Sequence, residues 1–231
     1  MKKILVLSCA MALNLISVAK PGNDYTLWYD EPAEEWVEAI PLGNGRLGAM
    51  VYGNPFHEEI QLNEETIWAG GPNNNVNPNA KAALSEIREL IFEGKYREAH
   101  ALCDSSVQSK KNHGMPYQVL GSLWLDFPGH EGYTGYYRDL DMENAVATVK
   151  YKVGDVDYKR EIITSFADQI VAIRLTASKK GKLSFSTYIN TPQKSTVETF
   201  NDAIILNGAS GGHENMKGGQ LKFTAIVRIY P

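Results

Sequence analysis

The sequence predicts a mainly β fold, a sandwich or barrel of antiparallel strands with a short two-helix insertion. Short apolar-rich runs recur at near-regular spacing and are separated by glycine, proline and asparagine, which is the pattern of strands joined by turns. Helical periodicity is confined to one region, residues 77–104. The chain therefore lacks the alternation of strands and helices that is typical of parallel α/β sheets.

The first 19 residues have the features of a signal peptide. Lys2 and Lys3 form a positive N-terminal region, an apolar stretch follows, and Ser17-Val18-Ala19 supplies the small residues that a signal peptidase reads. The stretch is too short and too polar at its end to span a bilayer. We therefore predict an exported protein, periplasmic or extracellular, with no membrane span. A lipoprotein acylated at Cys9 is the alternative, although the apolar region before that cysteine is very short.

The next part of the chain is expected to form four strands and then two helices. The strands are predicted at Tyr25–Tyr29, Trp36–Ile40, Leu47–Tyr52 and Glu59–Asn63. Asn77 is suited to cap the first helix with Pro78 at its first position. Apolar residues then recur at helical spacing, at Ala80, Leu84, Ile87 and Ile91. Gly94 should end this helix, and the second helix should run from about Lys95 to Asp104.

Strands return after the helices, and residues 20–231 are expected to form one domain. The predicted strands are Val119–Phe127, Ala145–Val153, Val156–Thr164, Ile170–Ala177, Leu183–Ile189, Ala203–Asn207 and Leu221–Ile229. Turn sequences at Gly154-Asp155, Lys180-Gly181 and Gly211-Gly212 separate some of them. No internal repeat and no long linker divides this part of the chain.

Composition and charge argue against several classes of protein. The 23 basic and 27 acidic side chains give a net charge of -4, with no basic run of five, which disfavours nucleic acid and anionic membranes as partners. Without the signal peptide Cys103 is the single cysteine, so no intrachain disulfide is expected, and core packing in the second helix is favoured over a role as nucleophile. The histidines are scattered without metal-ligand spacing, and we expect neither a metal nor a cofactor.

The acidic residues do not single out a catalytic pair. Asp139, Asp141 and Glu143 alternate, so a strand there would put all three carboxylates on one face. The glycine-containing loop of a calcium site is missing, and an exposed polar face is favoured. Glycoside hydrolysis needs two placed carboxylates or their equivalent, and none stands out, so we assign no catalytic residue.

The segment Gly43-Asn44-Gly45-Arg46-Leu47-Gly48 matches the glycine spacing of a dinucleotide-binding loop. Such a loop needs a helix to start there, because the phosphates sit on the helix N-terminus. Here a short strand follows instead, at Ala49–Tyr52. We therefore expect these glycines to serve tight turns and close strand approach.

The segment Gln61–Pro72 gathers amide, carboxylate, hydroxyl and indole groups just before a glycine-rich loop. Sugar sites use this mixture, because an aromatic ring covers the apolar side of a pyranose while planar polar groups bind its hydroxyls. The structural alternative is that Trp68 lies in the core and Asn63 ties down the loop backbone. From the residues alone both interpretations stay open.

An ordered set of motifs resembles the N-terminal domain of glycoside hydrolase family 95. It consists of Trp36 with Ala39–Met50, Gln61–Pro72, Ile87-Arg88 with Gly94–Ala99, Tyr117–Leu123, Tyr137–Asp141, Tyr158–Glu161 and Ser165. The resemblance runs from about Asp24 to the C-terminus. Any single motif is weak evidence, whereas the set in this order is specific.

The resemblance implies a large antiparallel β super-sandwich that packs against a catalytic (α/α)6 barrel. Family members are mostly α-L-fucosidases, with some acting on α-L-galactosides, and they hydrolyse the bond with inversion. Their catalytic residues belong to the barrel, which would begin beyond Pro231, so none is carried over to this chain. Because the family's sandwich normally continues further, we expect the chain to be incomplete at its C-terminal end.

The resemblance also implies that the Gln61–Pro72 loop faces the barrel. Asn63, Glu64, Thr66 and Trp68 are then expected to line or support the sugar site, with His113 as a further candidate. The predicted function is a non-catalytic N-terminal domain of an exported α-L-fucosidase-type glycoside hydrolase, inactive alone, with the barrel and a fucosylated glycan as partners. A free-standing carbohydrate-binding module and a purely structural sandwich are the alternatives.

Overall fold

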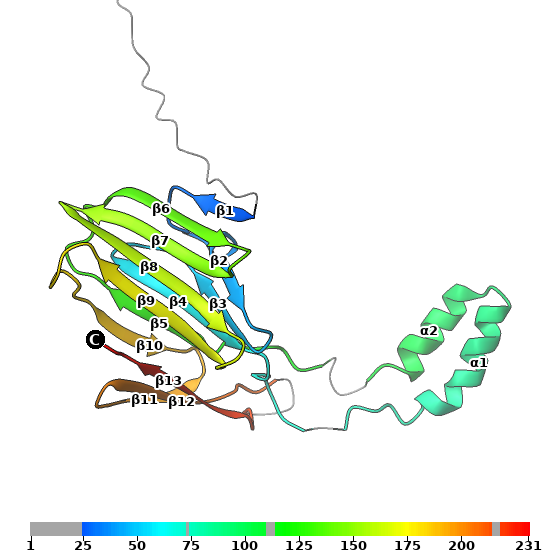
Figure 1. Ribbon diagram of the computed structural model, residues 1–231. Helices are drawn as coiled ribbons and strands as arrows, with labels where there is room; N and C mark the ends of the chain where they lie inside the picture. Colours follow the sequence, from blue (N-terminus) through cyan, green and yellow to red (C-terminus); the bar gives the residue numbers. More distant parts are fainter. Residues whose placement is uncertain (1–24, 73, 110–113, 214–217) are drawn as a thin grey trace, which may run out of the picture.

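The computed structural model describes residues 25–72, 74–109, 114–213 and 218–231. This part of the chain is mainly β, with three antiparallel sheets and one pair of helices, which confirms the predicted fold class (Figure 1). The first sheet has the order β1-β6-β7-β8-β9: Thr26–Tyr29, Thr134–Asp141, Val146–Val153, Val156–Ser165 and Ile170–Ala177. The second has the order β10-β5-β4-β3-β2: Ser186–Asn190, Gly121–Asp126, His57–Glu64, Leu47–Val51 and Ile40–Gly43. The third has the order β11-β12-β13: Lys194–Phe200, Ala203–Ala209 and Lys222–Arg228.

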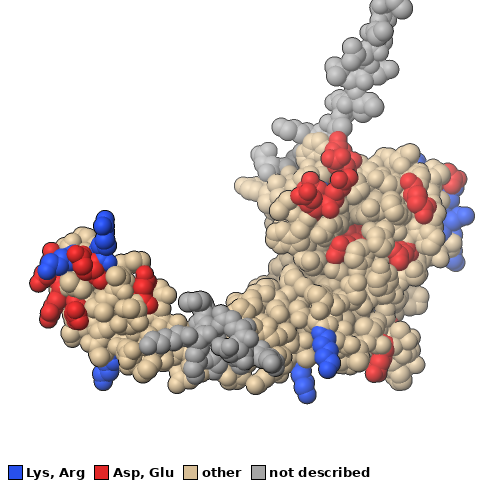
Figure 2. All heavy atoms as spheres, turned by 180° about the vertical axis from the view of Figure 1, so that it is seen from behind, with Lys and Arg blue, Asp and Glu red and all other residues tan. Residues whose placement is uncertain are grey.

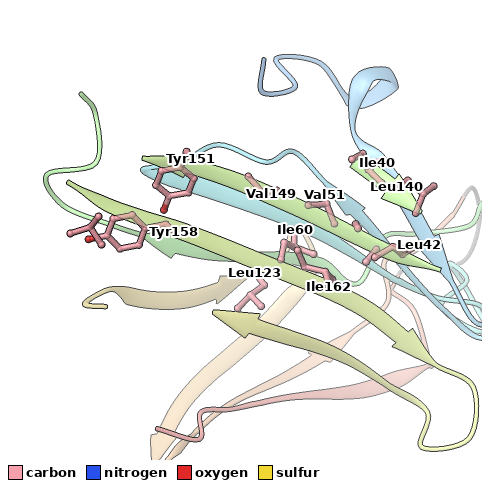
Figure 3. Close-up of a cluster of buried hydrophobic side chains, with 13 residues drawn as sticks. Ile40, Leu42, Val51, Ile60, Leu123, Leu140, Val149, Tyr151, Tyr158 and Ile162 are labelled. Atoms are coloured by element: carbon pink, nitrogen blue, oxygen red, sulfur yellow. The ribbon is translucent and has the colours of Figure 1, made fainter. Parts of the chain in front are cut away.

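The main core lies between the first and second sheets. Strands such as β8 alternate buried and exposed side chains because successive residues of a strand point to opposite faces. The apolar residues of the inner faces meet between the two layers (Figure 3): Ile40, Leu42, Val51, Ile60, Leu123, Leu140, Val149, Tyr151, Tyr158 and Ile162. A smaller core joins the third sheet to the second, where Leu206 packs with Ile67, Leu120 and Ile189.

A buried ion pair crosses the main core. Glu58 on β4 and Arg160 on β8 expose 0% and 2% of their side chains, and Glu58 Oε2 accepts a 2.7 Å hydrogen bond from Arg160 Nη1. The other Glu58 oxygen accepts from the Gly53 backbone N–H at 2.7 Å. Arg160 also donates to the Asn54 and Pro55 carbonyls and to the Tyr151 hydroxyl, so these contacts fasten the β3–β4 turn to the first sheet.

Arg138 on β6 fixes the N-terminal segment in a similar way. Its side chain is buried and donates to the carbonyl oxygens of Glu31 at 2.8 Å and Glu38 at 2.7 Å. The guanidinium carbon also lies 4.2 Å from the centre of the Tyr29 ring. The arginines in two of the family-like motifs therefore have a structural role inside the sandwich.

The two helices form a hairpin that projects away from the sheets (Figure 1). They are α1, Ala80–Phe92, and α2, Tyr96–Ser106, and each contains one buried residue, Ile87 and Ala99 respectively. Gly94, with a φ of +75°, ends the first helix as predicted. Cys103 is a free thiol on α2 and is half-buried.

Two local predictions were wrong, and some strands were not predicted. Trp36–Ile40 is not a strand: a 3₁₀ turn, η1 (Trp36–Glu38), forms there because the Glu38 carboxylate accepts from the Glu34 and Glu35 backbone N–H groups. Helix α1 begins at Ala80 after Asn79, while Asn77 forms a turn that precedes it by accepting from the Asn79 N–H. Strand β11 was not predicted, because every residue of it is exposed and its apolar pattern is therefore weak.

Candidate functional site

The glycine-rich segment is the tight turn between β2 and β3. Asn44 Oδ1 accepts from the backbone N–H groups of Arg46 at 3.1 Å and Leu47 at 2.7 Å, and its Nδ2 donates to the Ser165 carbonyl. Gly45 has a φ of +90°, which glycine adopts at little cost. No helix starts here, so the predicted turn is confirmed and the phosphate-binding geometry is missing.

Glu64, the last residue of β4, organises the loop that follows. Its Oε1 accepts from Arg46 Nε at 2.9 Å, and its Oε2 accepts from the Thr66 backbone N–H at 2.8 Å and the Thr66 hydroxyl at 2.5 Å. Partial burial raises the pKa of Glu64, but the hydrogen bonds from Thr66 and Arg46 outweigh burial and hold it below its usual value. Glu64 is therefore an ionised anchor whose oxygens already have partners.

Trp68 and Tyr117 form an aromatic pair beside this anchor. The two residues are joined by an isolated antiparallel bridge, and their rings meet edge to face with centroids 5.4 Å apart. The Trp68 indole N–H donates to the Glu65 carbonyl, and the Tyr117 hydroxyl donates to the Glu64 carbonyl. Trp68 is 47% exposed and Tyr117 42%, so both rings present apolar surface to solvent.

A shallow depression of ≈350 Å³ lies between the β2–β3 turn and Tyr117. Its lining includes Arg46, Gly48, Asn63 and Glu65. Asn63 stands opposite Gly48 in the β3–β4 register, on the outer face of the second sheet. The Asn63 Oδ1 atom is buried and has no hydrogen-bond partner.

Four of the five predicted site residues lie together. Asn63, Glu64, Thr66 and Trp68 follow one another from the end of β4 into the loop, whereas His113 lies outside the described residues. The structural alternative for this segment is wrong in two respects: Trp68 is half exposed, and Asn63 makes no hydrogen bond that could tie the loop. Glu64 ties the loop instead.

Sequence reasoning missed two members of the site, Arg46 and Tyr117. Both belong to motifs of the ordered set, but their meeting with Glu64 depends on strand pairing and on the bridge between Trp68 and Tyr117. A local pattern carries no signal for such a contact.

The other acidic candidates lie elsewhere. Asp139 and Asp141 share the outer face of β6, while Glu143 lies in the turn that follows, where its N–H donates to Asp141. Those three carboxylates therefore do not form one row. Within the described ranges, no group of three His, Cys, Asp or Glu residues is arranged to hold a metal.

Exposed rings, an amide and the hydrogen-bonded Glu64 carboxylate gather at one end of the second sheet, a mixture of groups that carbohydrate-enzyme domains use to bind sugars. Sequence comparison places the chain within that class of domains. It belongs to the family described as "Glycosyl hydrolase family 65, N-terminal domain", whose model matches residues 27–231.

Three relatives have names that point to fucosidases. Alpha-L-fucosidase 2 of Arabidopsis thaliana is 43% identical over 165 residues, which are 69% of this chain and 19% of the relative. Probable alpha-fucosidase A of Aspergillus niger is 33% identical over 180 residues, 74% of this chain and 21% of the relative. The protein of the same name from Aspergillus oryzae is 26% identical over 176 residues, which are 72% of this chain and 24% of the relative. The chain thus spans about a fifth to a quarter of the length of these relatives.

These matches confirm the prediction of a glycoside hydrolase N-terminal domain, and they are consistent with the resemblance to family 95. In the part of the chain that the structure describes, neither helix has the length and apolar character needed to cross a membrane.

Proposed function

We propose that this chain is the N-terminal β-sandwich domain of an exported α-L-fucosidase-type glycoside hydrolase of family 95, and that a separate catalytic domain, an (α/α)6 barrel, performs the hydrolysis. The observation that carries the proposal is the match to relatives named as fucosidases, of which this chain covers 19%, 21% and 24%. The rest of their length leaves ample room for a catalytic domain. The sequence shows no evident pair of catalytic carboxylates, which agrees with hydrolysis by a separate domain.

In this proposal the Asn63–Trp68 segment faces the barrel and forms one wall of the sugar site. The exposed rings of Trp68 and Tyr117 offer apolar surface for the C–H side of a pyranose. Glu64 holds the loop in place through Arg46 and Thr66. Seen from behind, the sandwich shows acidic side chains gathered over its upper and middle part, with basic ones near its edges (Figure 2).

The test is a substitution in a full-length relative. Replacing the residue that aligns with Trp68 by alanine should lower kcat/KM for 2′-fucosyllactose by about tenfold, equivalent to about 1.4 kcal/mol of transition-state stabilisation. The matched control is the residue that aligns with Trp28, a tryptophan stacked on Tyr137 on the outer face of the first sheet. Unchanged kinetics in the Trp68 variant, with the circular dichroism spectrum kept, would contradict the assignment of this loop.

Export is the second part of the proposal, and residues 1–19 support it with their positive start, apolar stretch and small residues before the cleavage point. Expression in a bacterium with this segment attached should give an exported protein whose N-terminal sequence begins at Lys20. Recovery of the uncut chain from the cytoplasm would contradict this part of the proposal.

A further inference from the structure

The α1–α2 hairpin buries little apolar surface of its own. The two helices have 13 and 11 residues, and each packs mainly on the other. Isolated helices shorter than about 12–15 residues are marginal in water, so helices of this length depend on tertiary packing. Each helix contributes one buried side chain to that packing, Ile87 from α1 and Ala99 from α2. Such a small contact indicates that the hairpin packs on a further surface.

The apolar stripe of each helix continues beyond its buried residue and is open to solvent there. On α1, Leu84 and Ile91 lie three residues before and four residues after Ile87, which puts all three on one face. Leu84 is nevertheless 43% exposed and Ile91 45%. On α2, Tyr96 lies three residues before Ala99 and is 69% exposed. The contact between the helices thus covers the middle of each stripe and leaves its ends uncovered.

Two aromatic side chains stand at the outer end of the hairpin. Phe92 ends α1 and Tyr96 begins α2, on either side of the turn at Gly94, and Phe92 is 88% exposed. Aromatic side chains that enter a pocket of a partner often carry much of the binding energy of an interface. Charged side chains of both signs surround this end of the hairpin (Figure 2), as in the polar rim of an interface. The outer end therefore has the composition of a docking surface.

The place of the hairpin in the chain indicates which partner covers it. The hairpin is inserted between Trp68 and Tyr117, the aromatic pair of the candidate site, and these two residues are joined by an antiparallel bridge. Beside the bridge, the Ala69 N–H donates to the Pro116 carbonyl at 3.0 Å. The segments that lead to and from the hairpin are therefore joined to each other at the candidate site. A domain that meets the Trp68–Tyr117 pair also meets the foot of the hairpin.

We infer that the open apolar face of the α1–α2 hairpin docks on helices of the catalytic domain of the same enzyme, with Phe92 and Tyr96 as anchors. The identity of this partner rests on the proposed function, in which that domain faces the Trp68–Tyr117 pair. A helical partner fits because helices pack through such apolar stripes, with the ridges of one in the grooves of the other. The relatives are long enough to contain the partner, since this chain covers 19%, 21% and 24% of them.

The experiment compares hydrogen–deuterium exchange, followed by mass spectrometry, in this chain and in a full-length relative. The backbone amides of the segment that aligns with residues 80–106 should exchange at least about 100-fold more slowly in the relative, because packing on the catalytic domain suppresses local opening of the helices. Strands β7 and β8, inside the first sheet, are the control and should be protected in both proteins. Equal exchange of the hairpin in the two proteins, whether fast or slow, would overturn the inference.

Substitutions in the relative test the two anchors. Serine at the positions that align with Phe92 and Tyr96 should speed exchange of the hairpin by at least about tenfold, because the aromatic contacts with the partner are lost. Serine at the position that aligns with Lys81, an exposed residue of the same hairpin, is the matched control and should leave the exchange unchanged. If both sets of variants exchange alike, Phe92 and Tyr96 are not anchors.

A second copy of the chain is the competing partner, because two such hairpins could pair as a four-helix bundle. Sedimentation equilibrium of the purified chain decides this point. We expect a monomer, and a dimer that Phe92→Ser with Tyr96→Ser abolishes would assign the surface to a second copy and overturn the inference.

Failure here and failure of the proposed function give different results. A relative that releases fucose but whose hairpin exchanges as fast as in this chain contradicts the docking of the hairpin alone. A relative whose hairpin is protected, but whose kinetics do not change on substitution at the position of Trp68, contradicts the assignment of the loop alone.

Discussion

The buried ion pair between Glu58 and Arg160 leads to a prediction about stability. In Glu58→Ala, Arg160 keeps its charge inside the core and loses the 2.7 Å bond to the carboxylate, while the Gly53 N–H loses its acceptor. Breaking a buried pair by removing one partner costs about 3–5 kcal/mol. For a chain of this size each kcal/mol lowers the melting temperature by about 2–4 °C, so we expect a fall of roughly 6–20 °C.

The control for this prediction is the neighbouring exposed pair on β8. Lys159 and Glu161 expose 40% and 27% of their side chains, and breaking such a surface pair costs about 0–1 kcal/mol. The assay is calorimetric melting of Glu58→Ala and Glu161→Ala beside the original chain. The double variant Glu58→Leu/Arg160→Met should recover part of the loss, because apolar residues need no partner. Equal melting temperatures for Glu58→Ala and Glu161→Ala would refute the reasoning.

Two further predictions concern a turn and a carboxylate. Gly53 has a φ of +81°, and a Cβ there would stand 2.6 Å from the Tyr136 hydroxyl, whereas Gly45, at +90°, has open space. Gly45→Ala should lower the free energy of unfolding by about 1–2 kcal/mol because of its left-handed backbone. Gly53→Ala should lower it by about 1–3 kcal/mol more because of the added clash, and urea unfolding measures both values. Equal losses of stability in the two variants would contradict a cost from the clash. Glu64 has a lowered pKa when folded, so its stabilising contribution is full above its unfolded pKa of about 4.5 and is lost as pH falls through the lowered value. The stability difference between the chain and Glu64→Gln should therefore shrink on acidification, and a difference that grows would contradict this sign.

Much of the fold could be predicted because its signals are local. Alternation along Val146–Val153 and Val156–Ser165, and the stop at Gly94, are visible in the sequence without knowledge of the packing. What could not be predicted depends on distant contacts. The Glu58–Arg160 pair joins residues 102 positions apart, and an exposed edge strand such as Lys194–Phe200 has no apolar face to mark it.

The candidate site could likewise be predicted only where its signals are local. The residues from Asn63 to Trp68 could be predicted because they are contiguous and chemically mixed, but Arg46 and Tyr117 join them only through strand pairing. That Glu64 holds the loop in place also depended on the structure, since its hydrogen bonds with Arg46 and Thr66 are seen only there. Residue types in a pattern indicate a kind of site, and the geometry assigns the roles.

The most direct test of the central claim is fucose release from 2′-fucosyllactose by the purified chain, measured beside a full-length relative under the same conditions. We predict release by the relative and none by this chain, because the proposal assigns the chemistry to a separate catalytic domain. Turnover by the chain alone would contradict the proposal and would move the search for catalytic groups to Glu64, Glu65, Asp139 and Asp141.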